Sequence, residues 1–190
     1  MKLQKWIAVI GSPRRGRNTE KLVDIIINVL KEKNISVEKY YLDRAQMSPC
    51  INCEYCIEAG QCHINDDISN ILNEIKMSDG VILAGPSYNY NVTAQMKVLL
   101  DRTFSLNDFT GSVWRSRVGD GKKAIVVGNC KGSSKESMGY NTEAMRKVLD
   151  ELEIEVLDVI EYFDTKFTPV GENMSKINCI EDRVRKSEVL

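Results

Sequence analysis

The chain has 190 residues, of which 43% are hydrophobic and 28% charged, a composition typical of one soluble α/β domain with its own core. The formal net charge is -1, so no overall positive field points to nucleic acid or an anionic membrane as a partner. The apolar stretches have the length of strands rather than of a membrane-spanning helix, and no signal-peptide cleavage site follows the first of them. We therefore expect a cytoplasmic protein whose cysteines are thiols, metal ligands or redox groups rather than disulfides.

Predicted strands and helices alternate along the chain. Continuous apolar runs that end at glycine indicate strands buried on both faces, as in a parallel sheet. The predicted strands are 6–10, 37–42, 81–84, 124–127 and 155–160. Helical spacing of apolar residues predicts helices at 20–33, 68–75, 93–104 and 143–152. Asn18 or Thr19 is expected to cap the first helix. The polar tail after Phe167 is expected to contain a short last helix and to pack loosely.

This alternation predicts a doubly wound α/β domain with helices on both faces of a parallel sheet. Five strands favour the flavodoxin-like order 2-1-3-4-5 over a six-stranded dinucleotide-binding fold. We expect a single domain over residues 1–190, with a cysteine-rich insertion at about 47–66 and a long polar loop at 106–121. Ligands of such sheets bind beyond the carboxyl ends of the strands, so the turns after strands one, three and four are the candidate binding elements.

The turn after the first strand, from Gly11 to Thr19, is rich in glycine, hydroxyl groups and arginine and leads into a helix. Free backbone N–H groups and the helix dipole make such a start an anion site, so we favour a phosphate site over an ordinary basic turn. No G-x-G-x-x-G fingerprint occurs. Gly11 and Gly16 have P-loop spacing, but the two residues that follow are Arg17 and Asn18 instead of lysine and a hydroxyl residue. Nucleotide hydrolysis is therefore not expected.

The turn after the third strand carries two tyrosines and two asparagines between Ser87 and Val92. Tyrosine rings can stack on a planar heterocycle, and asparagine amides can form hydrogen bonds with its edge. Pro86 stiffens the start of this turn. The place of this turn opposite the phosphate turn favours a heterocycle site over an ordinary turn with exposed aromatic residues.

Four cysteines lie in one short run with the spacing C-x2-C-x2-C-x5-C: Cys50, Cys53, Cys56 and Cys62. A [4Fe–4S] cluster takes four thiolate ligands, whereas structural zinc usually takes two pairs separated by a longer spacer. We rank a cluster first, free thiols with structural roles second and zinc third, and a disulfide after oxidation remains open. Cys130 and Cys179, far from this run, are interpreted as small buried hydrophobic residues.

His63 is the only histidine, and it is interpreted as a solvent-facing loop residue. A hydrolase that needs a Ser-His or Cys-His pair is therefore disfavoured. No catalytic side chain is assigned, because a bound cofactor would carry the chemistry.

Three motifs together resemble a known family. Gly11-Ser12-Pro13-Arg14 with Asn18-Thr19 is similar to the phosphate loop of flavodoxin-like NAD(P)H-dependent FMN reductases. The stretch from Pro86 to Asn91, followed by Ala94, Lys97 and Asp101-Arg102, resembles the second flavin loop and following helix of that family. The cysteine run, with Gly60-Gln61-Cys62 and Asp66-Asp67, resembles the branch called iron–sulfur flavoproteins. The resemblance covers roughly residues 5 to 130.

The resemblance implies non-covalent FMN, a homo-oligomer and a [4Fe–4S] cluster held by Cys50, Cys53, Cys56 and Cys62. The residues it assigns to the FMN phosphate are Ser12, Arg14, Asn18 and Thr19. The residues it assigns to the isoalloxazine are Pro86, Ser87, Tyr88, Asn89 and Asn91, and Gly128-Asn129 is expected to border the flavin.

The function so predicted is that of an FMN-dependent oxidoreductase that passes electrons between a donor, FMN and the cluster. The donor is ferredoxin or NAD(P)H, and the final acceptor stays open. A cluster-free NAD(P)H-dependent FMN or quinone reductase and a non-enzymatic binding module with a structural metal are the alternatives. Arg115, Arg117, Lys122 and Lys123 are weighed as a contact for an acidic carrier, with a solvated loop as the favoured interpretation. The cysteine loop and residues 106–121 are expected at the interface between copies.

Overall fold

A parallel sheet of five strands runs through the middle of the molecule in the computed structural model, which describes residues 3–188. The strands are β1 (Gln4–Ile10), β2 (Ile35–Tyr41), β3 (Gly80–Pro86), β6 (Lys123–Asn129) and β7 (Glu155–Tyr162). Their spatial order is β2-β1-β3-β6-β7, and every neighbouring pair is parallel. This is the order 2-1-3-4-5 of the sequence prediction, which is confirmed.

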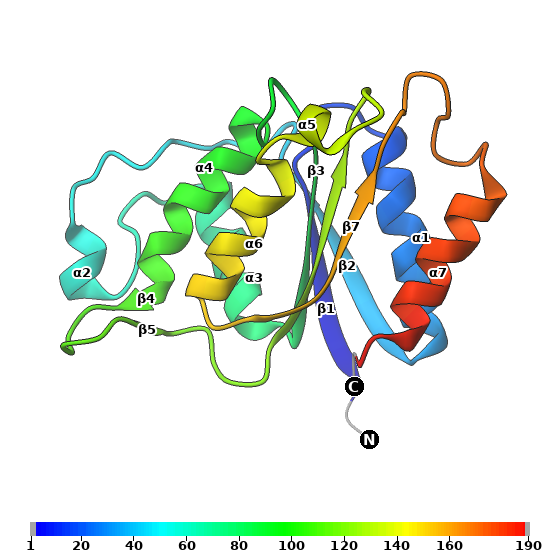
Figure 1. The fold of residues 1–190 in the computed structure, drawn as a ribbon. Helices are drawn as coiled ribbons and strands as arrows, with labels where there is room; N and C mark the ends of the chain where they lie inside the picture. Colours follow the sequence, from blue (N-terminus) through cyan, green and yellow to red (C-terminus); the bar gives the residue numbers. More distant parts are fainter. Residues whose placement is uncertain (1–2, 189–190) are drawn as a thin grey trace.

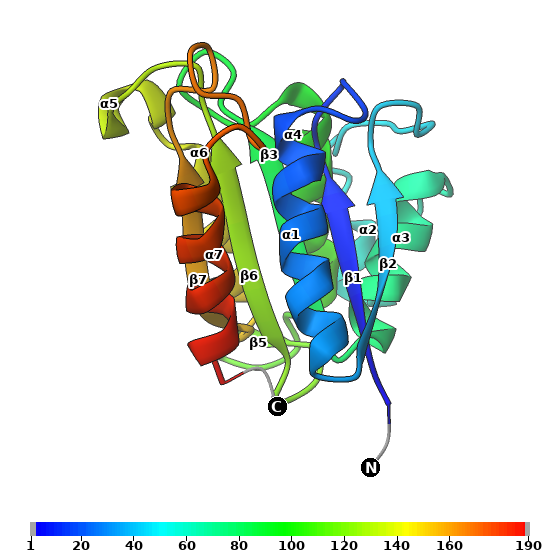
Figure 2. The same ribbon diagram turned by 90° about the vertical axis from the view of Figure 1, so that its right-hand side faces the viewer.

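Helices cover both faces of the sheet (Figures 1 and 2). One face carries α1 (Asn18–Glu32) and α7 (Met174–Lys186), and the other carries α3 (Asp67–Met77), α4 (Ala94–Arg102) and α6 (Asn141–Glu151). Side chains alternate along each strand, so Ile7 and Val9 of β1 enter one apolar cluster while Trp6, Ala8 and Ile10 enter the other. The central strands therefore read as continuous apolar runs because both of their faces are buried.

The short elements all lie in connections. They are α2 (Tyr55–Ala59), the 3-10 turn η1 (Thr103–Leu106), the hairpin strands β4 (Asn107–Asp108) and β5 (Arg115–Ser116), and α5 (Lys135–Met138). The predicted loop at 106–121 thus contains a small antiparallel hairpin. In Figure 1, α2 and this hairpin lie together at one end of the molecule, away from the sheet.

Three expectations about the helices and cysteines were wrong. Arg17, not Asn18 or Thr19, occupies the N-cap position of α1. The tail does not pack loosely, because α7 buries Ile177, Ile180 and Val184, and α7 lies beside α1. Cys179 lies on the outer face of α7 and is exposed, whereas Cys130 is buried as expected. Within residues 3–188, no helix is both long and apolar enough to cross a bilayer.

Candidate functional site

A cavity of about 710 Å³ opens beyond the carboxyl ends of β3 and β6, and we call it the strand-end cavity. Its volume is in the range that holds a cofactor-sized ligand. Its lining comprises Arg14, Pro86, Ser87, Tyr88, Asn89, Tyr90, Asn129, Cys130, Lys131, Gly132, Ser137 and Thr165. The cavity thus combines aromatic rings, amides and two cationic side chains at the edge of the sheet where doubly wound folds bind ligands.

Five of the nine residues assigned to FMN from the sequence line this cavity, namely Arg14, Pro86, Ser87, Tyr88 and Asn89. The sequence also placed Asn129 at its border, and Asn129 lines it. The turns after β1, β3 and β6 therefore meet around one space, as the strand order required.

Ser12, Asn18, Thr19 and Asn91 do not line the strand-end cavity. The Thr19 hydroxyl is buried and donates to Asn129 Oδ1 at 2.7 Å. Asn18 Oδ1 accepts from the N–H of Val170 at 3.0 Å, and Asn91 Oδ1 accepts from the N–H that follows it at 2.8 Å. Ser12 Oγ instead closes a tight turn with the backbone of Arg14. Ser12 and Thr19 thus contact two residues of the lining, Arg14 and Asn129, whereas Asn18 and Asn91 contact the backbone outside it.

Sequence reasoning missed Cys130, Lys131, Gly132, Ser137 and Thr165, and it considered Tyr90 only as one of two tyrosines that could stack on a heterocycle. Lys131 and its neighbours follow directly on β6, so the rule that ligands lie at strand ends could have found them. Thr165 follows β7, and its hydroxyl donates to Cys130 O at 2.9 Å, which joins the ends of the two strands. Ser137 comes from α5, a short helix that the sequence pattern did not reveal.

The phosphate turn is prepared for an anion at the start of α1. No side chain caps this helix in the described part of the chain, so its first N–H groups are not taken up by a capping side chain. Arg15 forms a forked ion pair with Asp43 and is turned toward β2. Arg14, by contrast, is exposed, lines the cavity, and has no side-chain partner within residues 3–188. Of the three arginines in this turn, Arg14 is the one that lines the strand-end cavity, and its side chain is therefore available to a ligand there.

Glu20 fixes the backbone of the same turn. Its Oε2 accepts from the N–H of Gly16 at 2.6 Å, and its Oε1 accepts from the Tyr41 hydroxyl. Burial raises the pKa of Glu20, but the hydrogen bonds from Gly16 and Tyr41 and the nearby Lys39 outweigh it, so the net pKa lies below its usual value. The carboxylate is thus charged at neutral pH and holds the turn closed.

The turn that follows β3 forms a rigid wall. Tyr88 and Asn91 exchange backbone hydrogen bonds of 2.8 and 3.1 Å, and Asn89 and Tyr90 between them are left-handed. Tyr90 O accepts from the N–H of Tyr140 at 2.8 Å. Gly139, at φ +59°, lies so close that a Cβ there would meet Tyr90 O at 2.2 Å. Only glycine allows this approach, which holds the aromatic wall in place.

All four clustered cysteines line a second, smaller cavity of about 80 Å³, the cysteine cavity. Its other lining residues are Ile51, Asn52, Glu54, Ile57, His63, Ile64 and Phe104. Burial and then the neighbouring thiols raise the pKa of Cys56. His63 is exposed, as predicted, but its Nδ1 also lies 3.3 Å from Cys53 Sγ. Among residues 3–188, no three His, Cys, Asp or Glu side chains are grouped closely enough to hold a single metal ion.

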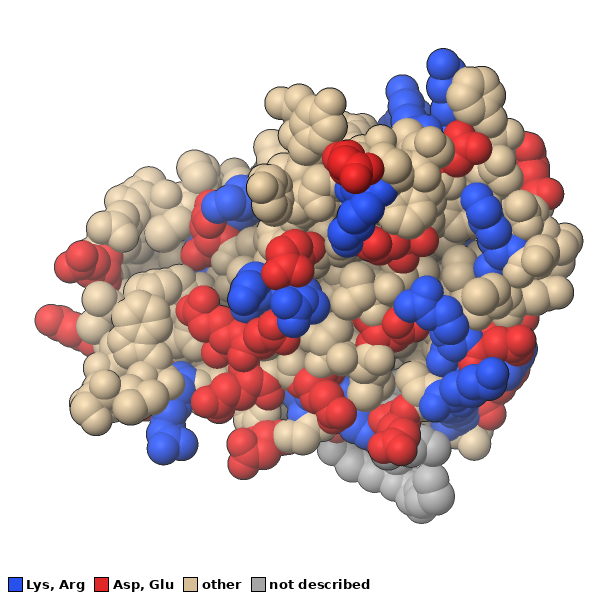
Figure 3. Space-filling view, in the orientation of Figure 1, with Lys and Arg blue, Asp and Glu red and all other residues tan. Residues whose placement is uncertain are grey.

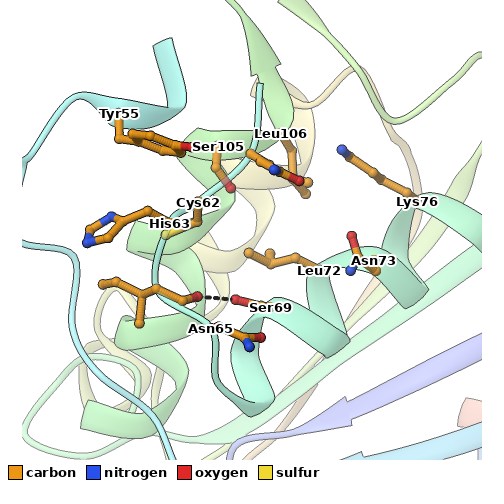
Figure 4. Close-up of a pocket in the computed structure, with 12 residues that line it drawn as sticks. Tyr55, Cys62, His63, Asn65, Ser69, Leu72, Asn73, Lys76, Ser105 and Leu106 are labelled. Atoms are coloured by element: carbon orange, nitrogen blue, oxygen red, sulfur yellow. Dashed lines mark hydrogen bonds between the residues drawn. The ribbon is translucent and has the colours of Figure 1, made fainter. Parts of the chain in front are cut away.

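A third cavity, of about 330 Å³, adjoins the cysteine cavity and shares Cys62, His63 and Ile64 with it. Figure 4 shows Tyr55, Cys62 and His63 on one side of it and Leu72, Asn73 and Lys76 of α3 on the other. The Ser69 hydroxyl donates to Ile64 O across its floor. The segment after the last clustered cysteine is thereby attached to α3.

The four basic residues weighed as a carrier contact do not form one surface. Lys122 is 6% exposed, and its Nζ donates to the backbone oxygens of Lys76 and Ser78. Its burial lowers its pKa. Arg117 forms an ion pair with Asp108 at 3.1 Å. Both the carrier contact and the solvated-loop interpretation are thus wrong for Lys122. Figure 3 shows basic and acidic side chains interspersed over the face of the molecule that is seen in Figure 1.

Known proteins are similar to this chain in sequence and in fold. The family model of the NADPH-dependent FMN reductases matches residues 4–169. An iron–sulfur flavoprotein of Methanocaldococcus jannaschii is 38% identical over 133 residues, which are 70% of this chain and 66% of that protein. An iron–sulfur flavoprotein of Methanosarcina thermophila is 34% identical over 131 residues, which are 64% of this chain and 69% of that protein. The chain thus spans about two thirds of the length of these relatives.

Solved structures share the fold at low sequence identity. An FMN-dependent NADH-azoreductase of Bacillus anthracis in complex with FMN superposes with a TM-score of 0.71 at 14% identity, covering 96% of both chains. An NAD(P)H:quinone oxidoreductase of Methanothermobacter marburgensis superposes with a TM-score of 0.66 at 18% identity, covering 97% of both chains. At these identities the likeness establishes the flavodoxin-like fold and nothing further.

Proposed function

Because the chain belongs to the NADPH-dependent FMN reductase family, and is a flavin-dependent oxidoreductase, we propose that it passes electrons between a donor, FMN and a [4Fe–4S] cluster. FMN would lie in the strand-end cavity and the cluster in the cysteine cavity. The observation that carries this proposal is that all four clustered cysteines line one small cavity in a fold of flavin reductases. The non-enzymatic binding module considered from the sequence does not agree with the family.

The strand-end cavity fits FMN by its volume and its donor groups. Arg14 and the free N–H groups at the start of α1 suit a phosphate. Tyr88 and Asn89 suit the ring system, one by stacking and the other by hydrogen bonding. Ser12, Asn18, Thr19 and Asn91 support this site from behind, through the hydrogen bonds described above.

The donor set of the cysteine cavity suits a [4Fe–4S] cluster. All four clustered cysteines line this one cavity, and four is the number of thiolates that such a cluster takes. Structural zinc usually takes two pairs of ligands separated by a longer spacer, which this run of cysteines lacks. Ile51, Ile57, Ile64 and Phe104 add apolar walls, and an apolar shell limits solvent access to a cluster.

When bound, FMN supplies two-electron hydride chemistry and one-electron transfer, and the cluster supplies one-electron transfer. The chain binds and orients these groups and needs no general acid or base for that task. The rigid wall at Tyr88–Asn91 orients the ring, and the turn held by Glu20 orients the phosphate. The tyrosines Tyr88, Tyr90 and Tyr140 stay exposed, so that an electron donor or acceptor meets an aromatic rim.

The donor is tested by anaerobic reductive titration of the cofactor-loaded protein with NADH, NADPH and reduced ferredoxin. We expect reduced ferredoxin to bleach the cluster absorption and the flavin bands together, and electrons that a nicotinamide donor gives to the flavin to reach the cluster as well. Full reduction of the flavin by NAD(P)H with no change in the cluster absorption would instead favour the simpler NAD(P)H-dependent FMN or quinone reductase.

We also propose that the protein is a homo-oligomer and that its cysteine end lies at an interface. Ile51, Tyr55, Val113 and Trp114 are each at least half exposed and belong to the cysteine loop or to the β4–β5 connection. In Figure 3 this end, at the left, shows an area of uncharged side chains with acidic groups at its edge and a basic group at its lower margin. Exposed apolar groups of this kind mark association surfaces. Light scattering should give a mass of at least twice 21.5 kDa, and Trp114→Glu should reduce it, whereas a monomeric mass for the parent would refute the proposal.

A further inference from the structure

Arg102, the last residue of α4, is a buried charge placed at the base of the cysteine loop, by which we mean residues 49–63. It is 1% exposed. Its Nη1 donates to Ser48 O at 3.1 Å, and its Nη2 donates to Ile64 O at 2.9 Å. Ser48 and Ile64 flank the cysteine loop directly, so one side chain joins the backbone on both sides of all four cysteines.

Asp66 completes this junction. Its Oδ1 and Oδ2 lie 3.0 and 2.9 Å from Arg102 Nη1, and Oδ2 also accepts from the N–H of Ser48 at 2.9 Å. Oδ1 caps α3 by accepting from the N–H groups of Ile68 and Ser69. Burial raises the pKa of Asp66, but the hydrogen bonds from Arg102 and Ser48 outweigh it, so the net pKa is lowered and the carboxylate balances the buried guanidinium.

Apart from the contacts of His63 with Cys53 and Tyr55, the cysteine loop has little internal support among the described residues. Its internal backbone hydrogen bonds, among those of the described residues, are confined to the turn at 54–60. Asn52 and Glu54 adopt left-handed conformations at φ 52° and 62°, which are unfavourable for residues other than glycine. The positions of the four thiols therefore depend on how the two ends of the loop are held.

The turn η1, which follows α4 directly, supplies a wall of the cysteine cavity. Phe104, two residues after Arg102, lines that cavity and stacks on Phe109 at a centroid distance of 4.5 Å. Met96 and Leu99 fix α4 in the core beside the sheet. Helix α4 thus provides the tie at the base of the loop, and the turn η1, which follows it directly, provides an apolar wall of the cysteine cavity.

We propose that Arg102 is a positioning residue for the cysteine-bound cluster: its guanidinium ties Ser48 to Ile64 and so holds the four thiols around one cavity before a cluster is inserted. Lysine cannot replace it, because one ammonium group lacks the planar fork that reaches both backbone oxygens and the carboxylate. This inference rests on the proposed function in one respect, the identity of the group that the thiols bind.

The test compares three variants under anaerobic reconstitution with iron and sulfide. Arg102→Lys keeps the charge and loses the fork. The double variant Arg102→Met with Asp66→Asn removes the buried charges together, while asparagine still caps α3. Arg146→Met, in an exposed pair on α6, is the control for loss of an arginine.

We expect Arg102→Lys and the double variant to hold the cluster about 10- to 100-fold more weakly than the parent, as is usual when a residue supporting the ligands is lost. Both should keep the flavin stoichiometry and circular dichroism of the parent, and any residual cluster should have a shifted midpoint potential. In the metal-free protein, both should be cleaved faster within residues 49–63 by a protease, and their cysteines should be alkylated faster. Arg146→Met should match the parent in every measurement.

Parent-like iron content and potential in both variants would overturn the role of Arg102. So would equal rates of cleavage and alkylation in the metal-free proteins. A parent that takes up no iron would refute the cluster instead, and the metal-free comparison would still decide whether Arg102 holds the loop.

Discussion

Replacing Cys56 with serine is expected to abolish the cluster and leave FMN bound. Cys56 is the third of the four clustered cysteines and is partly buried in the cavity that they line. Serine offers no thiolate, so three ligands would remain for a centre that needs four. The iron content should fall from about four per chain to near zero, with loss of the broad absorption around 400 nm.

Cys179→Ser is the matched control for this experiment, because Cys179 is an exposed lone thiol on α7. It should bind as much iron as the parent. Retention of the full iron content by Cys56→Ser would contradict the assignment of these four cysteines as ligands, because only three of their thiolates would remain.

The second large effect is expected at the phosphate turn. Arg14→Gln should weaken FMN binding about 10- to 100-fold, because a charge-assisted hydrogen bond to phosphate contributes roughly 1.5–3 kcal/mol. The dissociation constant is measured by titrating FMN into the flavin-free protein and following the quenching of flavin fluorescence.

Arg15→Gln provides the control within the same turn. Arg15 has the same charge but is paired with Asp43 and stacks on Tyr41 at 4.0 Å. Its loss should change the dissociation constant by a factor of less than about three, because Arg15 does not line the strand-end cavity. Equal losses in the two variants would mean that the turn attracts FMN by its overall charge, and that Arg14 makes no specific contact.

The sheet and its order followed directly from the sequence, for a physical reason. Both faces of the central strands are buried, so runs such as Ile7–Ile10 and Val81–Ala84 had to be apolar throughout. The strand order then placed the turns after β1, β3 and β6 at one edge. That geometry is why Arg14, Tyr88 and Asn129 could be assigned to one site from the sequence.

Features that depend on tertiary partners could not be predicted in this way. Helix α7 has few apolar residues. In the structure Ile177, Ile180 and Val184 form one buried stripe along it, and this stripe is what packs the helix against the rest of the molecule. Asn18 and Thr19 have the chemistry of helix caps but form hydrogen bonds with distant segments instead. A sequence pattern relates a residue only to its near neighbours in the chain. The hydrogen-bond partners of Asn18 and Thr19 lie more than a hundred residues away.

The buried cations were the hardest to predict. Arg102 was noted in the sequence only as part of a motif, and Lys122 as a surface charge. Both are buried because carbonyl oxygens and, for Arg102, a carboxylate converge on them from other elements. Such a site cannot be recognised from the run of residues around the cation, since Arg and Lys are almost always exposed unless paired.

The most direct test of the account is an anaerobic visible spectrum of the purified protein with quantitation of flavin, iron and sulfide. We predict one FMN and about four irons per chain, with flavin bands superimposed on a broad absorption near 400 nm. Flavin without iron, even after reconstitution, would contradict the cluster and leave a flavin reductase whose cysteines serve another purpose. Absence of both cofactors would contradict the account of the two cavities altogether.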